Sequence, residues 1–154
     1  MSAIRPNHDQ FVALAIAPDD APVVMLNLLK FKAKADGGGA SGASGAAEYE
    51  KYGDAAIQMV EARGGKALWI GRADQVLIGD ADANDWDAVA LVQYPSRKAF
   101  IDMVTSKDYE KAHEHRESGL ERTVLIACSE RASETTAQRP EGSGARSRPM
   151  DEAL

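Results

Sequence analysis

The sequence has 154 residues, of which 44% are hydrophobic and 27% are charged, a composition typical of one globular domain. Its formal net charge of −6 argues against a nucleic-acid partner, because phosphate backbones are bound by clustered Lys and Arg. No stretch approaches the roughly 20 apolar residues of a membrane span, and residues 1–10 lack the apolar core of a secretion signal. We therefore expect a cytoplasmic protein with neither nucleic acid nor membrane as a partner.

Composition divides the chain into three regions. Residues 1–21 form an N-terminal extension, and residues 22–130 carry the patterns of a folded α+β domain. Residues 131–154 are rich in Ser, Glu, Thr, Pro, Gly and Arg and nearly lack aliphatic side chains, so we expect a disordered tail. Within the domain, glycine and small residues dominate positions 36–46, which favours a flexible connection. Two interpretations stay open for it, a mobile flap and a plain loop enlarged by insertion.

The first strong strand signal covers residues 23–31, a nearly continuous apolar run that follows Pro22. Such a run is typical of a strand that is buried on both faces. Apolar residues then recur at helical spacing from Ala47 to Arg63, and Gly64 and Gly65 supply a helix stop. We expect a glycine-rich connection and then an amphipathic helix.

Two strands are predicted next, at residues 66–79 and 86–94, with turn residues between them. Ser96 and Ser106 are each placed to cap a short helix. A last strand is expected at residues 122–128, and its single cysteine, Cys128, is interpreted as a buried thiol in a reducing compartment.

The element order is therefore β-α-β-β-α-β, with the second helix broken in two. This order predicts a ferredoxin-like α+β fold, in which an antiparallel sheet carries both helices on one face. An apolar sheet face that no helix covers needs another cover, and a second copy of the chain is the simplest one. The sequence therefore predicts a homodimer.

Several separated segments also resemble a known family. They are VMLNLLKF (24–31), YEKYG (49–53), WDAV (86–89), YPSR (94–97) and YEKAHEHR (109–116). In this order and spacing they are similar to an uncharacterised bacterial family of the dimeric α+β barrel superfamily, over residues 22–128. The resemblance implies the fold and the dimer. Relatives in the wider superfamily include cofactor-independent monooxygenases, muconolactone-type isomerases and haem peroxidases, so it does not select a reaction.

Two polar residues in apolar or helix-terminal positions are candidate ligand contacts. Asn27 interrupts the apolar strand, and an amide buried there requires a hydrogen-bonding partner or a ligand. Arg97 follows the capping Ser96, where its guanidinium and the free N–H groups of a helix start suit a carboxylate. A structural amide and an ordinary surface arginine are the alternatives, which we weigh equally.

Four residues on two helices form the other candidate group. Tyr109, His113 and Arg116 share one face of the last helix, and Tyr52 lies on the first. Such a group in an apolar cavity supplies an acid, a base and an anion contact. We assign His113 and Tyr52 as candidate catalytic residues, and Tyr109 and Arg116, with Asn27 and Arg97, as candidate ligand contacts.

No cofactor or metal is predicted. His113 and His115 do not share a helix face, no zinc-binding motif is present, and haem ligation by His113 is disfavoured. The leading hypothesis is a homodimer that binds a small anionic or aromatic metabolite between sheet and helices. Its enzymatic form is a cofactor-independent monooxygenase or isomerase, and the rival is a non-catalytic dimer without a ligand.

Overall fold

The computed structural model describes residues 4–18, 21–36 and 42–131. Eight elements follow one another in these ranges: α1 (His8–Ile16), β1 (Val23–Phe31), α2 (Gly45–Ala62), β2 (Lys66–Arg72), β3 (Ala88–Tyr94), α3 (Arg97–Val104), α4 (Lys107–Gly119) and β4 (Leu120–Ser129). The expected tail lies outside the described residues beyond position 131, and so does the middle of the glycine-rich connection, residues 37–41.

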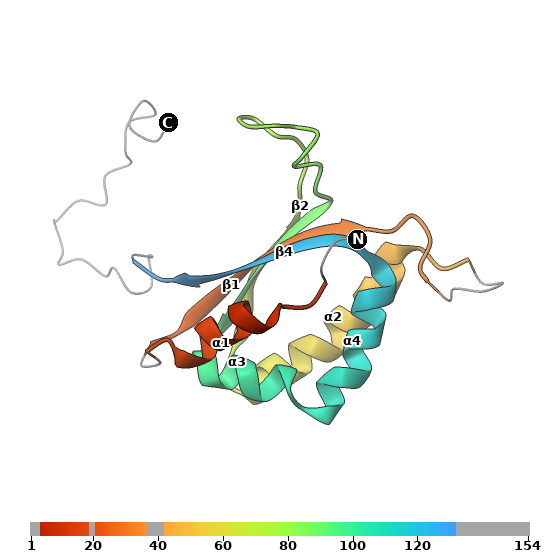
Figure 1. The fold of residues 1–154 in the computed structure, drawn as a ribbon. Coiled ribbons are helices and arrows are strands. Elements are labelled where there is room, and N and C mark those ends of the chain that lie inside the picture. The colour runs from red at the N-terminus through yellow and green to blue at the C-terminus, as the bar shows by residue number, and fades with distance from the viewer. Residues whose placement is uncertain (1–3, 19–20, 37–41, 132–154) are drawn as a thin grey trace, which may run out of the picture.

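The strands form one antiparallel sheet in the order β2-β3-β1-β4. All four helices lie on one side of this sheet, as Figure 1 shows. This arrangement is the split βαβ of the ferredoxin-like fold, and it confirms the predicted fold class and the break of the second helix into α3 and α4.

Two expectations about the elements are wrong. The second strand ends at Arg72 instead of position 79, so residues 73–87 form a long connection that rises on the side of the sheet away from the helices (Figure 1). Helix α1 was not expected, because its apolar run is short and ends at Pro18. It forms with a capping box, in which the Asn7 side chain accepts from the Gln10 backbone and the Gln10 side chain accepts from Asn7.

Serine caps begin the other three helices. The hydroxyls of Ser44, Ser96 and Ser106 each accept a hydrogen bond from the backbone N–H three residues later. The Ser96 and Ser106 caps were predicted. Helix α2 stops where Gly64 takes a left-handed φ of +81°, which agrees with the expected glycine stop.

Alternate residues of β1 build the core on the helix side of the sheet. Val23, Met25 and Leu29 are buried there, and the core cluster continues through residues of α2, β3, α3 and α4, namely Val60, Tyr94, Phe100, Met103 and Tyr109. Two glycines bring α2 and α4 together beneath the end of β1. A Cβ on Gly45 would lie 2.3 Å from the carbonyl oxygen of Lys32 and 2.5 Å from that of Gly119, so only glycine fits.

No helix formed by the described residues lies on the other face of the sheet. Its central row crosses all four strands as Ile126, Leu26, Leu91 and Trp69, and the next row holds Val124, Leu28 and Val89. Trp69 is 54% exposed and Ile126 is 47% exposed. Within residues 4–18, 21–36 and 42–131, helices thus cover only one face of the apolar first strand. Cys128, on the same open face, is half-buried instead of buried as expected. None of the described helices is both long enough and apolar enough to cross a membrane.

Candidate functional site

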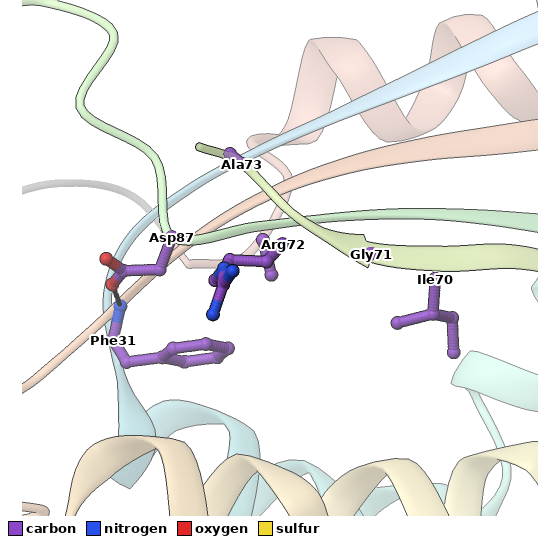
Figure 2. Close-up of a pocket in the computed structure, with 7 residues that line it drawn as sticks. Phe31, Ile70, Gly71, Arg72, Ala73 and Asp87 are labelled. Carbon is purple, nitrogen blue, oxygen red and sulfur yellow. Dashed lines mark hydrogen bonds between the residues drawn. The ribbon is translucent and has the colours of Figure 1, made fainter. Parts of the chain in front are cut away.

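A surface hollow lies on the helix side of the sheet, near one end of β2 and β3. It has a volume of about 550 Å³ and is lined by Phe31, Ile70, Gly71, Arg72, Ala73, Asp87 and Ala88. Figure 2 shows the side chains of Phe31, Arg72 and Ile70 pointing from the sheet toward the helix layer. The volume lies within the range of small-molecule sites. We call this hollow the sheet cleft.

One cation and one aromatic ring distinguish the sheet cleft chemically. The Arg72 Nε donates to the Asp74 carboxylate at 2.8 Å, but both side chains are highly exposed, so this pair is weak. Phe31 lines the same cleft as Arg72 and supplies its aromatic ring. Asp87 is held by the sheet itself, because one carboxylate oxygen accepts from the Phe31 backbone at 2.8 Å and the other lies 3.5 Å from Lys30 Nζ. The free face of the guanidinium is therefore the natural contact for an acidic group.

Asn27 lies on the same face of the sheet as the cleft. It pairs in register with Ala90, which in turn pairs with the cleft residue Ile70. Its amide nitrogen donates to the carbonyls of Met25 at 3.2 Å and Ala90 at 3.3 Å. Its amide oxygen accepts no hydrogen bond from the residues that the structure describes. Asn27 thus has structural partners for its donor, and it shares the sheet face of the cleft without lining the cleft.

The four helical candidates do meet, but in a second place, between α2 and α4. The hydroxyls of Tyr52 and Tyr109 lie 2.9 Å apart, and the Arg116 guanidinium lies 5.9 Å from the centre of the Tyr52 ring. The ring of His113 contacts that of Tyr109, with 5.6 Å between centroids. We call these four residues, with the neighbouring Tyr49, the tyrosine–arginine cluster.

Burial sets the protonation states in this cluster. It raises the pKa of Tyr52 well above 10, and the nearby Tyr109 adds to the shift, so the Tyr52 hydroxyl keeps its proton. Burial is also the main cause that lowers the pKa of His113 to about 4, with the positive charges of Arg116 and Arg5 contributing. His113 is therefore neutral at pH 7, and the Glu117 carboxylate 3.7 Å from its Nδ1 is not an ion-pair partner.

The cluster and the sheet cleft are joined by ring contacts. Centroid distances of 5.4 Å and 5.2 Å link Phe31 to Tyr49 and Tyr49 to Tyr52, and a further 5.9 Å links Tyr52 to Tyr109. A chain of aromatic side chains therefore runs from the cleft wall to the buried His113 and Arg116.

Arg97 lies apart from both groups. It lines a small hollow of about 210 Å³ with Ala15, Lys98 and Ile101, and its Nη1 donates to the Pro18 carbonyl at 3.4 Å. The six candidates thus occupy three places. Sequence reasoning missed Phe31, Ile70 and Arg72, although the alternation of Ile70 and Arg72 along one strand indicates a shared face. It also missed the N-terminal residues over the cluster, for which no local pattern exists.

Within residues 4–18, 21–36 and 42–131, no three His, Cys, Asp or Glu side chains converge on a common point.

The fold and these two groups define a class of protein. The chain is a ferredoxin-like α+β protein with polar residues gathered between its sheet and its helices. Residues 43–128, more than half of the chain, match the model of a family described as a domain of unknown function, DUF1330. The chain belongs to this family, which confirms the resemblance found in the sequence.

Solved structures agree with this assignment. The protein of unknown function RPA0582 from Rhodopseudomonas palustris is 30% identical to this chain. The alignment covers 86% of this chain and 100% of RPA0582, and the two structures superpose with a TM-score of 0.78. The structure of methylated RPA0582 is also 30% identical, with 84% of this chain and 95% of the other covered and a TM-score of 0.77. A ferredoxin-like DABB family protein from Mesorhizobium loti is 14% identical over 71% of this chain and 96% of its own, with a TM-score of 0.48, too low to carry an argument. The sequence matches none of the curated proteins with which it was compared.

Proposed function

We propose that this protein is a homodimer that binds a small anionic or aromatic metabolite in the sheet cleft. The observation that carries the proposal is the cleft itself, a hollow of about 550 Å³ between sheet and helices with a single arginine and an aromatic ring on its wall. An arginine suits a carboxylate, and the ring of Phe31 suits a flat apolar body. The Asn27 amide oxygen offers an acceptor to a hydroxyl or amine of the ligand.

The open face of the sheet supports the dimer. Seven apolar side chains form two rows across it, and no described helix covers them. Contiguous apolar surface of this kind marks an interaction site. Because the rows lie in the middle of the sheet, two copies packed face to face would bury both of them, as in a dimeric α+β barrel.

An enzymatic form of the proposal uses the tyrosine–arginine cluster. His113 or Tyr52 would move a proton in a cofactor-independent isomerisation or oxygenation, and Arg116 would stabilise negative charge. The raised pKa of Tyr52 restricts its hydroxyl to the role of a donor, whereas the neutral His113 imidazole can accept a proton. The ring contacts from Phe31 to Tyr109 support communication between this cluster and the cleft.

Calorimetric titration with benzoate, 4-hydroxybenzoate and malonate tests ligand binding. We expect saturable binding of at least one of these acids to the wild type, at least tenfold weaker binding by Arg72→Ala, and unchanged binding by Arg63→Ala as the matched control. Arg63 donates to a backbone carbonyl away from the cleft. Equal affinities for wild type and Arg72→Ala would refute the assignment of the cleft.

A non-catalytic dimer is the second candidate. It is favoured by the hydrogen bonds that two parts of the cluster already make, since the Tyr52 and Tyr109 hydroxyls bond each other and Arg116 donates to the Ile4 carbonyl. Under this alternative no acid binds in the cleft or the cluster, and Arg72→Ala and Arg116→Lys change stability only.

A further inference from the structure

The Arg116 guanidinium is a buried charge without an acidic partner. Only 5% of the residue is exposed, and none of the carboxylates that the structure describes lies within ion-pair distance of it. Its position in the last turn of α4 and the Tyr52 ring 5.9 Å away offset part of the cost. Burying an ion is nevertheless expensive unless it is paired, so an unpaired guanidinium here suits an anion.

The surroundings of Arg116 hold more donors than acceptors. The Tyr52 and Tyr109 hydroxyls share one hydrogen bond, which leaves one of their two O–H groups available to another acceptor. The guanidinium has five N–H groups, of which one donates to the Ile4 carbonyl and another is directed to the Tyr49 hydroxyl, so most of them have no acceptor among the described residues. A ligand that suits these surroundings would therefore bring acceptors, and an apolar body would suit the tyrosine rings beside it.

A second buried group also lacks a partner. The Nδ1 of His113 makes no hydrogen bond in the described part of the chain, although the residue is only 6% exposed. It lies 3.7 Å from the same Glu117 oxygen to which Arg5 donates. The N-terminal residues thus lie directly over His113 as well as over Arg116.

A backbone carbonyl accepts a hydrogen bond from the Arg116 guanidinium. Arg116 Nη1 donates to the carbonyl oxygen of Ile4 at 2.8 Å. An amide carbonyl carries a partial negative charge, as one oxygen of a carboxylate does, but it offers Arg116 only one acceptor where a carboxylate offers a bidentate pair. Ile4 therefore holds the place that a carboxylate oxygen would take.

We propose that Arg116 and the tyrosines around it form a binding site for a small aromatic carboxylate, and that residues 4–6 close this site as a strap. The carboxylate replaces the Ile4 carbonyl on Arg116, and the aromatic body lies against the tyrosine rings around Arg116 once the half-buried Ile4 has moved away. The inference is independent of the sheet cleft, because Arg116 does not line it.

The strap is held weakly enough to be displaced. Apart from the Ile4 carbonyl, its polar anchor is the ion pair from Arg5 to Glu117, whose side chains are 60% and 42% exposed. Pairs this exposed contribute little to stability. Residues 5–10 are exposed, and the following α1 buries no residue completely. Local opening of such a segment costs far less than unfolding of the domain.

The test is a benzoate titration followed through backbone amide resonances, with benzamide as the uncharged control. It is run in the Arg72→Ala background, so that the arginine of the sheet cleft contributes nothing. We expect the amide resonances of Ile4 and Arg5 to move toward unstructured positions as benzoate saturates the protein, and benzamide to leave them unchanged.

Two further substitutions in that background separate the parts of the site. Arg5→Ala removes the strap's ion pair and should tighten benzoate binding by about 1.5- to 5-fold. Arg116→Gln should weaken it at least tenfold. Because that variant leaves a buried polar group and can fail to fold, Arg116→Lys is measured beside it and should also bind benzoate more weakly, since it lacks the planar fork.

Three results would each overturn the inference: benzoate binding that leaves the Ile4 and Arg5 resonances in place, equal affinity in the Arg116→Lys variant, or no binding by either the parent or Arg5→Ala. If the sheet cleft binds no benzoate, by contrast, wild type and Arg72→Ala bind benzoate with equal affinity. The two proposals therefore fail separately.

Discussion

Acidification should destabilise this protein through one histidine, His113. Its pKa is about 4 in the folded state and 6.5 in an exposed setting, because burial and the charges of Arg116 and Arg5 disfavour the imidazolium, with Glu117 opposing them. The unfolded chain therefore binds a proton that the folded chain does not, and stability falls as the pH drops through 6.5 toward 4. The full difference corresponds to roughly 3 kcal/mol, of which roughly 2 kcal/mol is lost between pH 7 and pH 4.5.

Urea unfolding of wild type and His113→Gln at pH 7, 5.5 and 4.5 measures this contribution. Some carboxylates have a lowered pKa in the folded protein, such as Glu48 beside His115 and Asp85 beside Arg122. Their protonation on acidification also destabilises the protein. This effect occurs in both proteins and cancels in the difference. We expect wild type to lose roughly 2 kcal/mol more than the variant, and His8→Gln, an exposed control, to follow wild type. Parallel curves for wild type and His113→Gln would refute the account of a buried neutral imidazole.

Three further predictions concern packing and pairing. Gly45→Ala should lower the free energy of unfolding by at least about 2 kcal/mol, because the new Cβ would lie 2.3 Å from a backbone oxygen. Gly53→Ala, which has open space around it, should be neutral or stabilising. Equal effects of the two substitutions in urea unfolding would contradict the close approach at Gly45. Tyr52→Phe should cost about 1 kcal/mol by removing the bond to Tyr109, and no loss in the same assay would argue against it. If the proposed dimer forms through the open sheet face, Ile126→Lys should make the protein a monomer with an unchanged circular dichroism spectrum; a dimeric Ile126→Lys variant in sedimentation velocity would locate the interface elsewhere.

Local patterns were sufficient to predict most elements. The apolar run of β1, the serine caps of α3 and α4 and the glycine stop after α2 act within a few residues, and the structure has each of them. The second strand was predicted too long because Val76, Leu77 and Ile78 continue its apolar composition. Leu77 and Ile78 are almost fully exposed in the connection to β3, so composition alone did not show where pairing ends.

The site depends on contacts between distant residues, which local patterns do not encode. Helical spacing placed Tyr109, His113 and Arg116 on one buried face, and the structure has this face. Spacing within one element does not say that Arg97 lies elsewhere or that Ile4 reaches Arg116, 112 positions away. These contacts follow from how α1 and the chain before it pack on the domain.

The most direct test of the proposed function is native mass spectrometry of freshly purified protein, since one spectrum reports both subunit number and retained ligand. The account predicts a dimer with an excess mass equal to that of bound small acids, and a smaller excess in Arg72→Ala. A monomer with the bare mass of the chain would contradict both the shared sheet face and the binding site.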